Sequence, residues 1–274
     1  MINALKILWE QVTNLPLIIR MVKFGDQNTY GSFILGQTWK IVNPILQVTA
    51  YFLVFGLGFR QVTMPGAPTS SPLYYLAWMM FGMAIWRFMN EAIMNGSSSI
   101  KRQLKIVTKM KFPMSVLPSI SIGTSIWTLI VLTVLGLAFL FISGQPISSH
   151  WPWVIYYLIA TLIFVYSFAL FNSTILIIIP DYISILRLVM SMGMWFAGVI
   201  FNLGQMNNLV GDILRLTPFY YLVAGYRDAL FAPDPVLARE FTSTTIIFWC
   251  SVLLLLIVGT YLHRSFKDVF VEYK

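Results

Sequence analysis

The chain has 274 residues, of which 58% are hydrophobic and only 10% are charged. A soluble domain carries about 25% charged residues, so this composition excludes an ordinary water-soluble globule and a disordered chain. There are 18 basic and 10 acidic residues, a net charge of +8, and the basic ones gather in short connections between apolar runs. That distribution is typical of cytoplasmic loops in a membrane protein and argues against a nucleic-acid partner. The single cysteine, Cys250, permits neither an intrachain disulfide nor a cysteine-based metal site.

The first 40 residues are too polar to cross a bilayer. Their apolar positions at helical spacing are Ile2, Leu5, Trp9 and Val12. This spacing predicts an amphipathic helix that lies along the membrane surface. A second piece, residues 30–40, leads to Pro44, where the first span should begin. Its aromatic residues Tyr30 and Trp39 are expected at the interface, either as plain anchors or as a flap at the cytoplasmic mouth of a pathway.

Six apolar stretches are long enough to span a bilayer, which needs roughly 20 residues of helix. No charged residue occurs between Phe112 and Pro180, a run too long for one helix, and the turn-forming segment 143–150 divides it. The predicted spans are residues 44–60, 73–94, 115–142, 151–179, 183–202 and 244–262.

An even number of spans places both termini on the same side of the membrane. The connection between the second and third spans, residues 95–113, has no acid but five basic residues: Lys101, Arg102, Lys105, Lys109 and Lys111. This bias predicts that both termini and this connection lie in the cytoplasm. We therefore expect one membrane domain over residues 1–274, with an interfacial segment (1–40), a six-helix bundle (44–262) and a cytoplasmic tail (263–274).

Residues 98–108 form the most informative polar connection. Ile100, Leu104 and Val107 make one apolar stripe, and basic side chains occupy the rest of the surface. This pattern predicts a short helix on the cytoplasmic side. Such a helix either lies on anionic lipid headgroups or inserts its apolar stripe into a groove of a cytoplasmic partner.

The external segment 202–242 is long for a loop without structure. Thr217 followed by Pro218 is typical of a helix start, and Pro233 and Pro235 would end that helix. A preceding helix is expected at 209–216. Together they predict two short helices that dip into the outer leaflet.

The sequence contains no phosphate-binding loop of the G-x-x-x-x-G-K-[ST] type and no recognisable catalytic motif. Arg87 and Glu91 are charged residues within a predicted span, and their four-residue spacing allows an ion pair. A proton-driven carrier normally has a carboxylate or histidine near the membrane midplane. The lack of one in the sequence favours an external source of energy.

Several segments, in order, resemble one family: the permease subunits of ATP-binding-cassette polysaccharide exporters, and within it the teichoic acid translocation permeases. The segments are NTYGSFILGQTWKIVNP (28–44), VFGLGF (54–59), KMKFPMSVLP (109–118), PDY (180–182) and LTPFYYLVAGYRD (216–228). The first resembles the family pattern "YLG..W....NP", the third "K..FP...LP" and the last "NP.Y....YR". Thr217 and Pro180 depart from the Asn and Arg that the family has there.

This resemblance implies an all-α membrane protein with six transmembrane helices, an N-terminal interface helix, a cytoplasmic coupling helix and short external re-entrant helices. It also implies two copies of the chain with two ATPase subunits, which bind ATP and Mg, in a bacterial cytoplasmic membrane. The cargo would be a polymer such as wall teichoic acid on an undecaprenyl-diphosphate lipid. The residues implied to contact the ATPase are Ile100, Lys101, Arg102, Leu104, Lys105, Val107, Lys109 and Phe112.

Candidate pathway residues occupy one face of each of two predicted spans, although packing against lipid or neighbouring helices explains them equally well. They are Gln47, Tyr51 and Phe55 in the first span and Ser191, Trp195 and Asn202 in the fifth. The alternatives are the same architecture exporting an O-antigen-like polysaccharide or a drug, a membrane scaffold, and a scramblase or channel without an ATPase.

Overall fold

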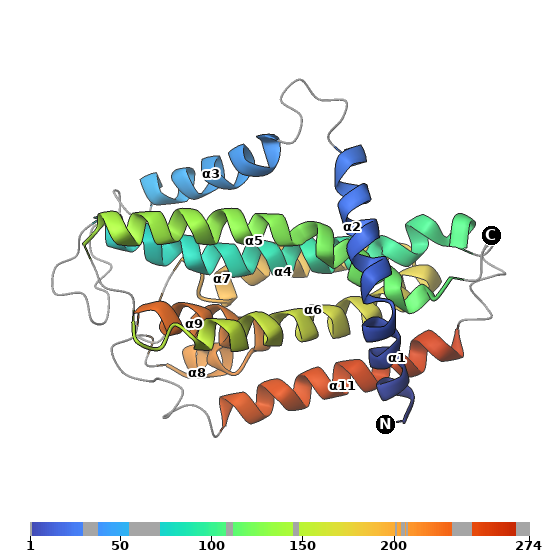
Figure 1. Cartoon of the computed structure of the whole chain (residues 1–274). Coiled ribbons are helices and arrows are strands. Elements are labelled where there is room, and N and C mark those ends of the chain that lie inside the picture. Colours follow the sequence, from blue (N-terminus) through green and yellow to red (C-terminus); the bar gives the residue numbers. More distant parts are fainter. Residues whose placement is uncertain are drawn as a thin grey trace.

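The computed structural model describes residues 2–29, 38–54, 72–107, 112–144, 148–200, 202–203, 206, 208–231 and 243–266. Every regular element in these ranges is a helix, which confirms the all-α prediction. Four long helices run side by side: α4 (Pro72–Val107), α5 (Leu117–Ile142), α6 (Trp153–Ile178) and α11 (Thr244–Ser265). Two N-terminal helices cross them near one end of the bundle (Figure 1).

Three stretches of the described chain are long and apolar enough to span a membrane. They are Met114–Ile142, which joins the short 3-10 helix η3 (Met114–Val116) to α5, together with α6 and α11. Their bounds agree closely with the spans predicted at 115–142, 151–179 and 244–262. Two shorter apolar helices stand where the first and fifth spans were expected: α3 (Trp39–Tyr51), which continues as a π-helical turn to residue 54, and α7 (Tyr182–Phe196). The multi-pass membrane architecture follows from this set.

The second span and the expected coupling helix are one element. Helix α4 runs unbroken for 36 residues, about 54 Å at 1.5 Å per residue. The prediction ended the span at residue 94 because a bilayer needs no more helix than that. The helix continues because Ile100 and Leu104 extend its buried side and pack against other parts of the chain. The coupling segment is therefore the end of a long rigid rod, and not a separate surface helix.

The hydrophobic core surrounds the first half of α4. Side chains that are almost completely buried there include Phe81, Ile85, Trp86, Phe88 and Met89. They pack with α6 and with α9 (Pro218–Phe231) in one continuous cluster. Aromatic rings meet edge-on where α9 enters, because Phe219 contacts both Trp86 and Phe164. This side of α4 is dry and close-packed.

The fifth predicted span is shorter than expected. Helix α7 ends at Phe196, and the chain then turns at Gly198, whose φ of +68° favours glycine. The prediction of a span over 183–202 was therefore wrong at its end. Irregular backbone at membrane depth needs hydrogen-bond partners from the protein. The partners come from α9 and from the short helix α8 (Leu209–Arg215), as described next.

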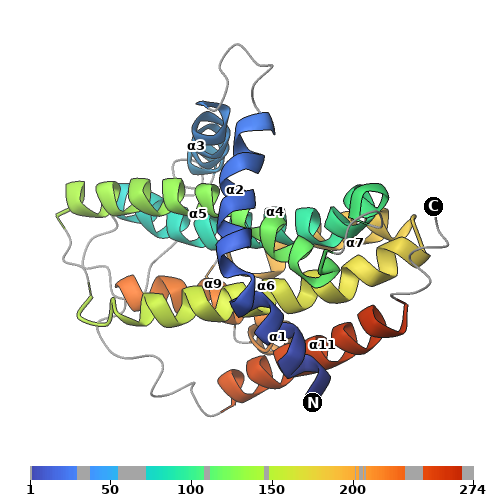
Figure 2. The same cartoon turned by 45° about the vertical axis from the view of Figure 1, so that its right-hand side comes forward.

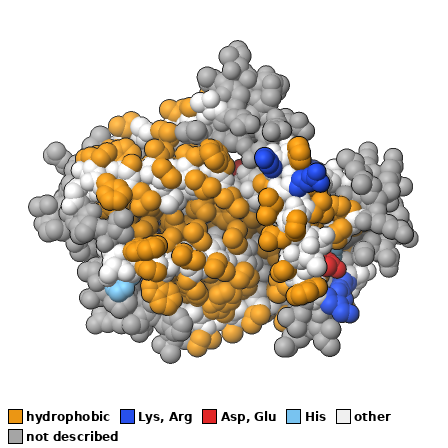
Figure 3. All heavy atoms as spheres, in the orientation of Figure 1, with side chains coloured by type: hydrophobic (Ala, Val, Ile, Leu, Met, Phe, Trp, Pro, Cys, Tyr) orange, Lys and Arg blue, Asp and Glu red, His pale blue; other side chains and the backbone are white. Residues whose placement is uncertain are grey.

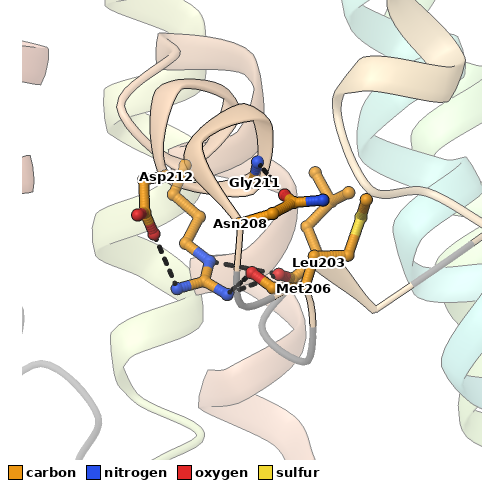
Figure 4. A network of polar contacts seen from close by, with 6 residues as sticks. Leu203, Met206, Asn208, Gly211 and Asp212 are labelled. Atoms are coloured by element: carbon orange, nitrogen blue, oxygen red, sulfur yellow. Dashed lines mark hydrogen bonds and ion pairs between the residues drawn. The ribbon is translucent and has the colours of Figure 1, made fainter.

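Two arginines satisfy the carbonyl groups after α7. The Arg215 guanidinium donates to the carbonyl of Leu203 from Nη2 and Nε, at 2.8 and 3.1 Å, and to the carbonyl of Met206 at 2.8 Å (Figure 4). Arg227 donates to the carbonyl of Gly198 at 2.5 Å. The side chains of Asn208 and Thr217 accept hydrogen bonds from backbone N–H groups in the first turns of α8 and α9, at 2.8 and 3.3 Å. Both short helices therefore form where the sequence predicts them, with Thr217 as the cap.

The N-terminal segment forms α1 (Ile2–Thr13) and α2 (Leu15–Thr29), which cross the long helices in both views (Figures 1 and 2). Ile7 of α1 is buried against the bundle, whereas Trp9 and Val12 are exposed. The predicted amphipathic helix is present, with its exposed side chains including the predicted Trp9 and Val12. The face of the molecule in Figure 3 is broadly apolar over the long helices, and Lys and Arg appear toward the end where α1 and α2 cross. An apolar surface of this kind suits contact with lipid tails.

Candidate functional site

A polar cavity of about 420 Å³ lies between α3, α4 and α5. Its longest wall is a stripe of polar side chains along α4. The residues of this stripe, four apart along the helix, are Arg87, Glu91, Asn95, Ser99 and Gln103, with Arg102 beside the last. Residues four apart are neighbours on a helix, and each step turns about 40° further, so the stripe winds around α4 over about 24 Å of its axis. We call this space the α4 cavity.

The other walls come from α3 and α5. Helix α3 contributes Trp39, Asn43 and Pro44, where the chain enters its first apolar stretch. Helix α5 contributes three hydroxyl groups and an indole: Ser121, Thr124, Trp127 and Thr128. The cavity therefore combines two guanidinium groups, one carboxylate, several amides and hydroxyls, and two tryptophans.

Hydrogen bonds hold several of these side chains in place. The Arg102 guanidinium donates to the carbonyl of Asn95 at 3.0 Å and to its side-chain oxygen at 3.4 Å, which draws Arg102 back along α4. The Thr128 hydroxyl donates to the Glu91 carboxylate at 2.8 Å and so connects α5 with α4. Arg87 is half-buried in the same wall. The ion pair predicted between Arg87 and Glu91 stays a prediction, although both side chains line the same space.

The position of these charges along α4 gives the cavity its significance. Arg87 and Glu91 fall within the predicted span, where a charge facing lipid tails costs about 2.5–3.5 kcal/mol on insertion scales. Facing a polar cavity removes this cost, because water or a polar ligand solvates them. Among the described residues, no cluster of His, Cys, Asp or Glu could hold a metal ion. The chemistry of the cavity is that of binding a polar or anionic group.

The residues expected to contact an ATPase divide into a buried and an exposed set. Ile100 and Leu104 are buried in a small cluster with Ile18 of α2 and Ile177 of α6, and Phe112 packs against the same cluster. The apolar stripe of the coupling segment is thus used within the chain, because folding already covers it. Ile100 and Leu104 are not available as a docking surface in this structure, contrary to the prediction.

Lys101 and Arg102 are exposed at the end of α4. They form the accessible part of the coupling segment among the described side chains. Lys109 lies outside the described residues, and the side chains of Lys105 and Val107 lie outside the described part as well.

Among the described residues, the predicted pathway residues lie on or just after two helices with different neighbours. Helix α3 packs on α4 and α5, whereas α7 packs on α4 and α6. Gln47 and Tyr51 are half-buried on α3, and Ser191 and Trp195 are exposed on α7. Asn202 is half-buried after α7, and Phe55 and the proposed gate residue Tyr30 lie outside the described residues. Trp39, the other predicted gate residue, is half-buried in the wall of the α4 cavity.

A second polar cluster fastens α1 to the segment that follows α4. The Gln11 side chain donates to the hydroxyl of Tyr166 at 2.9 Å and to the carbonyl of Ser115 at 3.2 Å. It also accepts from the Ser119 hydroxyl at 2.7 Å, and the Ser115 hydroxyl donates to Glu10 at 2.6 Å. The cluster joins α1, η3, α5 and α6. We call it the α1 latch.

Sequence reasoning missed most residues of both polar clusters. The α4 stripe could have been found, because Asn95, Ser99 and Gln103 continue the four-residue spacing that identified Arg87 and Glu91. The four residues of α5 that line the cavity give little signal, because other serines and threonines are scattered along the same apolar span. Glu10 and Gln11 gave no signal, because polar residues on an amphipathic helix are expected to face water.

The comparisons with known proteins agree on one class. The sequence profile described as "ABC-2 type transporter" matches residues 16–231. Two proteins of Klebsiella pneumoniae, each named O-antigen export system permease protein RfbA, are 23% and 22% identical over 244 residues, which is 89% of this chain and 89% of theirs. A protein of the same name from Myxococcus xanthus is 28% identical over 127 residues, 45% of either chain.

Proposed function

Because the chain belongs to the ABC-2 type transporter family, we propose that it is the membrane subunit of an ATP-driven exporter of lipid-linked polysaccharide. The observation that carries this proposal is the alignment with O-antigen export permeases over 89% of both chains. The α4 cavity supports it, because its amide, hydroxyl and guanidinium groups suit a sugar carrying phosphate. In this arrangement the chain transports and does not catalyse.

The energy comes from a separate ATPase chain, since the sequence contains no phosphate-binding loop of its own. Two copies of the permease would pair with two ATPase subunits, each binding ATP and Mg. The exposed Lys101 and Arg102 are the contact we propose on this chain. Their charge favours an acidic groove on the ATPase and a cytoplasmic location, with both termini on that side of a bacterial plasma membrane.

Helix α4 offers a direct mechanical link between the motor and the cavity. Lys101 and Arg102 lie on the same continuous helix as Arg87, about 21–23 Å along its axis. A helix that moves as a rigid body carries a displacement at its end into the cavity wall without an intervening hinge. Cycles of ATP binding and hydrolysis would thus reposition Arg87 and Glu91 relative to α3 and α5.

The cargo we propose is a polymer on undecaprenyl diphosphate, and two polymer classes have support. The named relatives favour an O-antigen-like polysaccharide, whereas the motifs at 28–44 and 109–118 resemble wall teichoic acid permeases. Both classes share the diphosphate-linked sugar at the lipid end. An export assay with each polymer distinguishes them.

The test uses the permease co-expressed with a candidate ATPase and reconstituted in vesicles. Affinity purification should recover both chains, and lipid-linked polymer should reach the opposite leaflet only with ATP. Reversing charge with Lys101→Glu and Arg102→Glu together should reduce ATPase recovery at least about tenfold, since like charges across an interface cost several kcal/mol. Arg20→Glu, an exposed charge reversal on α2, is the matched control and should leave recovery unchanged.

Three outcomes would contradict the proposal. The first is polymer movement at full rate without any ATPase, which would identify a scramblase or channel. The second is failure of every candidate ATPase to bind the intact permease, which would favour a scaffold. The third is ATP-dependent movement of a drug with no movement of either polymer.

A further inference from the structure

The α4 cavity has the size and composition of a ligand site. Its volume of about 420 Å³ falls within the roughly 300–1,000 Å³ that ligand pockets occupy. Protein interiors are close-packed, so polar side chains that only bonded to one another would leave no open volume between them. Here Arg87 on α4 and Asn43 on α3 stand on different helices around an open volume. The arrangement is therefore that of a site open to a polar occupant.

The charged groups select the kind of occupant. Two guanidinium groups face one carboxylate in this cavity, so an anion is favoured over a cation. A guanidinium binds phosphate through parallel N–H donors, which a lysine ammonium does not provide. Arg102 is already positioned by its hydrogen bonds to Asn95, so part of its conformational entropy is lost before a ligand arrives.

The uncharged groups indicate that the anion carries a sugar. Asn43 and Asn95 supply amide donors and acceptors, and Ser121 and Thr124 supply hydroxyls. Trp39 and Trp127 offer indole surfaces, and an indole combines an apolar face with an N–H donor. Sugars present alternating hydroxyl groups and C–H faces that match this combination. Glu91, held by Thr128, is placed to accept hydrogen bonds from sugar hydroxyls.

The surroundings of the cavity suit a lipid tail. Trp127 is 43% exposed while it lines the cavity, so it lies at the boundary between the polar space and the outer surface of α5. One and two turns further along the same helix, Ile130 and Val134 are exposed. On α3, Leu46 is exposed one turn beyond Asn43. A ligand with a polar head and an apolar chain could place the head in the cavity and leave the chain in the bilayer.

We propose that the α4 cavity binds the phosphate-bearing sugar headgroup of a lipid, one in each copy of the chain. Arg87 binds the phosphate, and Trp127 with the amide groups contacts the first sugar. This rests on the proposed export function and gives it a loading site on the same helix that carries the ATPase contact. Binding precedes translocation, so the site is occupied in the absence of ATP.

The experiment measures equilibrium binding to the permease–ATPase complex in phosphatidylcholine nanodiscs without nucleotide. Three phosphate-bearing probes are compared to find which kind of ligand the cavity binds. They are a short polyprenyl diphosphate carrying one sugar, phosphatidylglycerol, and a free sugar phosphate. The first should bind most tightly, because only it fills the cavity and also places a chain on α5. Arg87→Gln should weaken it roughly ten- to a hundredfold, the cost of losing a charge-assisted hydrogen bond.

Matched controls address folding and specificity. Arg20→Gln makes the same change on the exposed surface of α2 and should leave affinity within twofold. Trp127→Ala should weaken the sugar-bearing probe several-fold more than the same prenyl diphosphate without sugar. Trp151→Ala, which removes an exposed tryptophan near the start of α6, should change neither. Arg87→Lys keeps the charge without the planar donors and should recover only part of the affinity.

The outcomes separate this inference from the export function. Equal binding of phosphatidylglycerol, with competition between the two lipids, would identify a general anionic-lipid site and overturn the sugar assignment. Unchanged affinity and unchanged ATP-dependent export in Arg87→Gln would overturn the cavity as a loading site while leaving the exporter intact. If the unaltered permease neither recovers an ATPase nor exports polymer, the export function itself is overturned.

Discussion

Two pairs of arginines in this structure have opposite surroundings. Arg227 is 3% exposed, stacks over the ring of Trp78 at 3.7 Å and donates to the carbonyl of Gly198. Arg215 likewise donates to the carbonyls of Leu203 and Met206. By contrast, Arg87 and Arg102 on α4 line an open cavity. The first two arginines complete the fold, whereas the second two face a space that the described part of the chain does not fill.

The difference shows that charge within a membrane domain does not by itself indicate function. Between α7 and α9, irregular backbone leaves carbonyl groups without helical hydrogen-bond donors. A guanidinium, which has five N–H donors, provides the missing hydrogen bonds. At the α4 cavity, backbone hydrogen bonds are already made within three helices. The arginines there face the cavity, and Arg102 is bonded to Asn95 of its own helix. Substitutions should therefore affect stability at Arg215 and Arg227 and ligand binding at the α4 cavity.

The largest effect on stability is expected for Arg227→Met. It leaves the carbonyl of Gly198 buried without its donor and removes the contact with Trp78, a loss of about 3 kcal/mol. Thermal unfolding in detergent should show a clear fall in melting temperature. Arg87→Met is the matched change in the cavity and should alter stability by less than about 0.5 kcal/mol. Equal destabilisation by the two substitutions would remove the distinction.

A smaller loss of stability is expected for Gly225→Ala, where α9 packs against α6 in the hydrophobic core. A Cβ atom at this position would lie 2.0 Å from the Tyr157 ring, which is itself buried. Since the ring cannot move into open space, α9 must shift away from α6, at a cost of about 2 kcal/mol. Ser121→Thr adds one carbon at the cavity wall and should cost less than about 0.5 kcal/mol. Melting temperatures of both variants measure the contrast, and an unchanged Gly225→Ala protein would show that the α6–α9 contact is looser than described.

The smallest of the three effects is expected in the α1 latch. Gln11→Leu removes the hydrogen bonds to Tyr166, Ser115 and Ser119, and the hydroxyl groups left behind find partial compensation. The expected loss is about 1 kcal/mol, with faster proteolytic cleavage between α1 and α2. Thr13→Leu makes a polar-to-apolar change on the exposed side of α1 and should leave the cleavage rate unchanged. A latch variant as resistant as the unaltered chain would indicate that apolar contacts such as that of Ile7 hold α1 alone.

The sequence predicted the elements whose signal is local. Long uncharged runs defined α5, α6 and α11, because lipid requires continuous apolar helix. Thr217 and Pro218 defined the start of α9, because a cap needs only its own neighbours. The amphipathic N-terminal helix followed from spacing in the same way. The end of α4 was mispredicted, since the break at residue 94 assumed a bilayer thickness and could not include the packing of Ile100 and Leu104.

The candidate site was only partly predictable. Arg87 and Glu91 stood out because charge is rare in apolar runs, and Asn95, Ser99 and Gln103 share their spacing. The opposite wall, with Ser121 and Trp127 on α5 and Asn43 on α3, depends on which helices are neighbours. The pathway residues proposed on α3 and α7 stay a prediction, because the face of a helix does not reveal what stands opposite to it.

The amino-acid sequence by itself determined that this protein lies in a membrane, the approximate position of its long apolar helices, and the family to which its motifs point. These properties depend on composition and on spacing along one helix. Only the tertiary structure decided that the coupling segment continues α4, that its apolar stripe is covered within the chain, and that Arg227 and Arg87 have different surroundings. Those properties depend on contacts between segments far apart in the chain, and such contacts are set by how side chains pack.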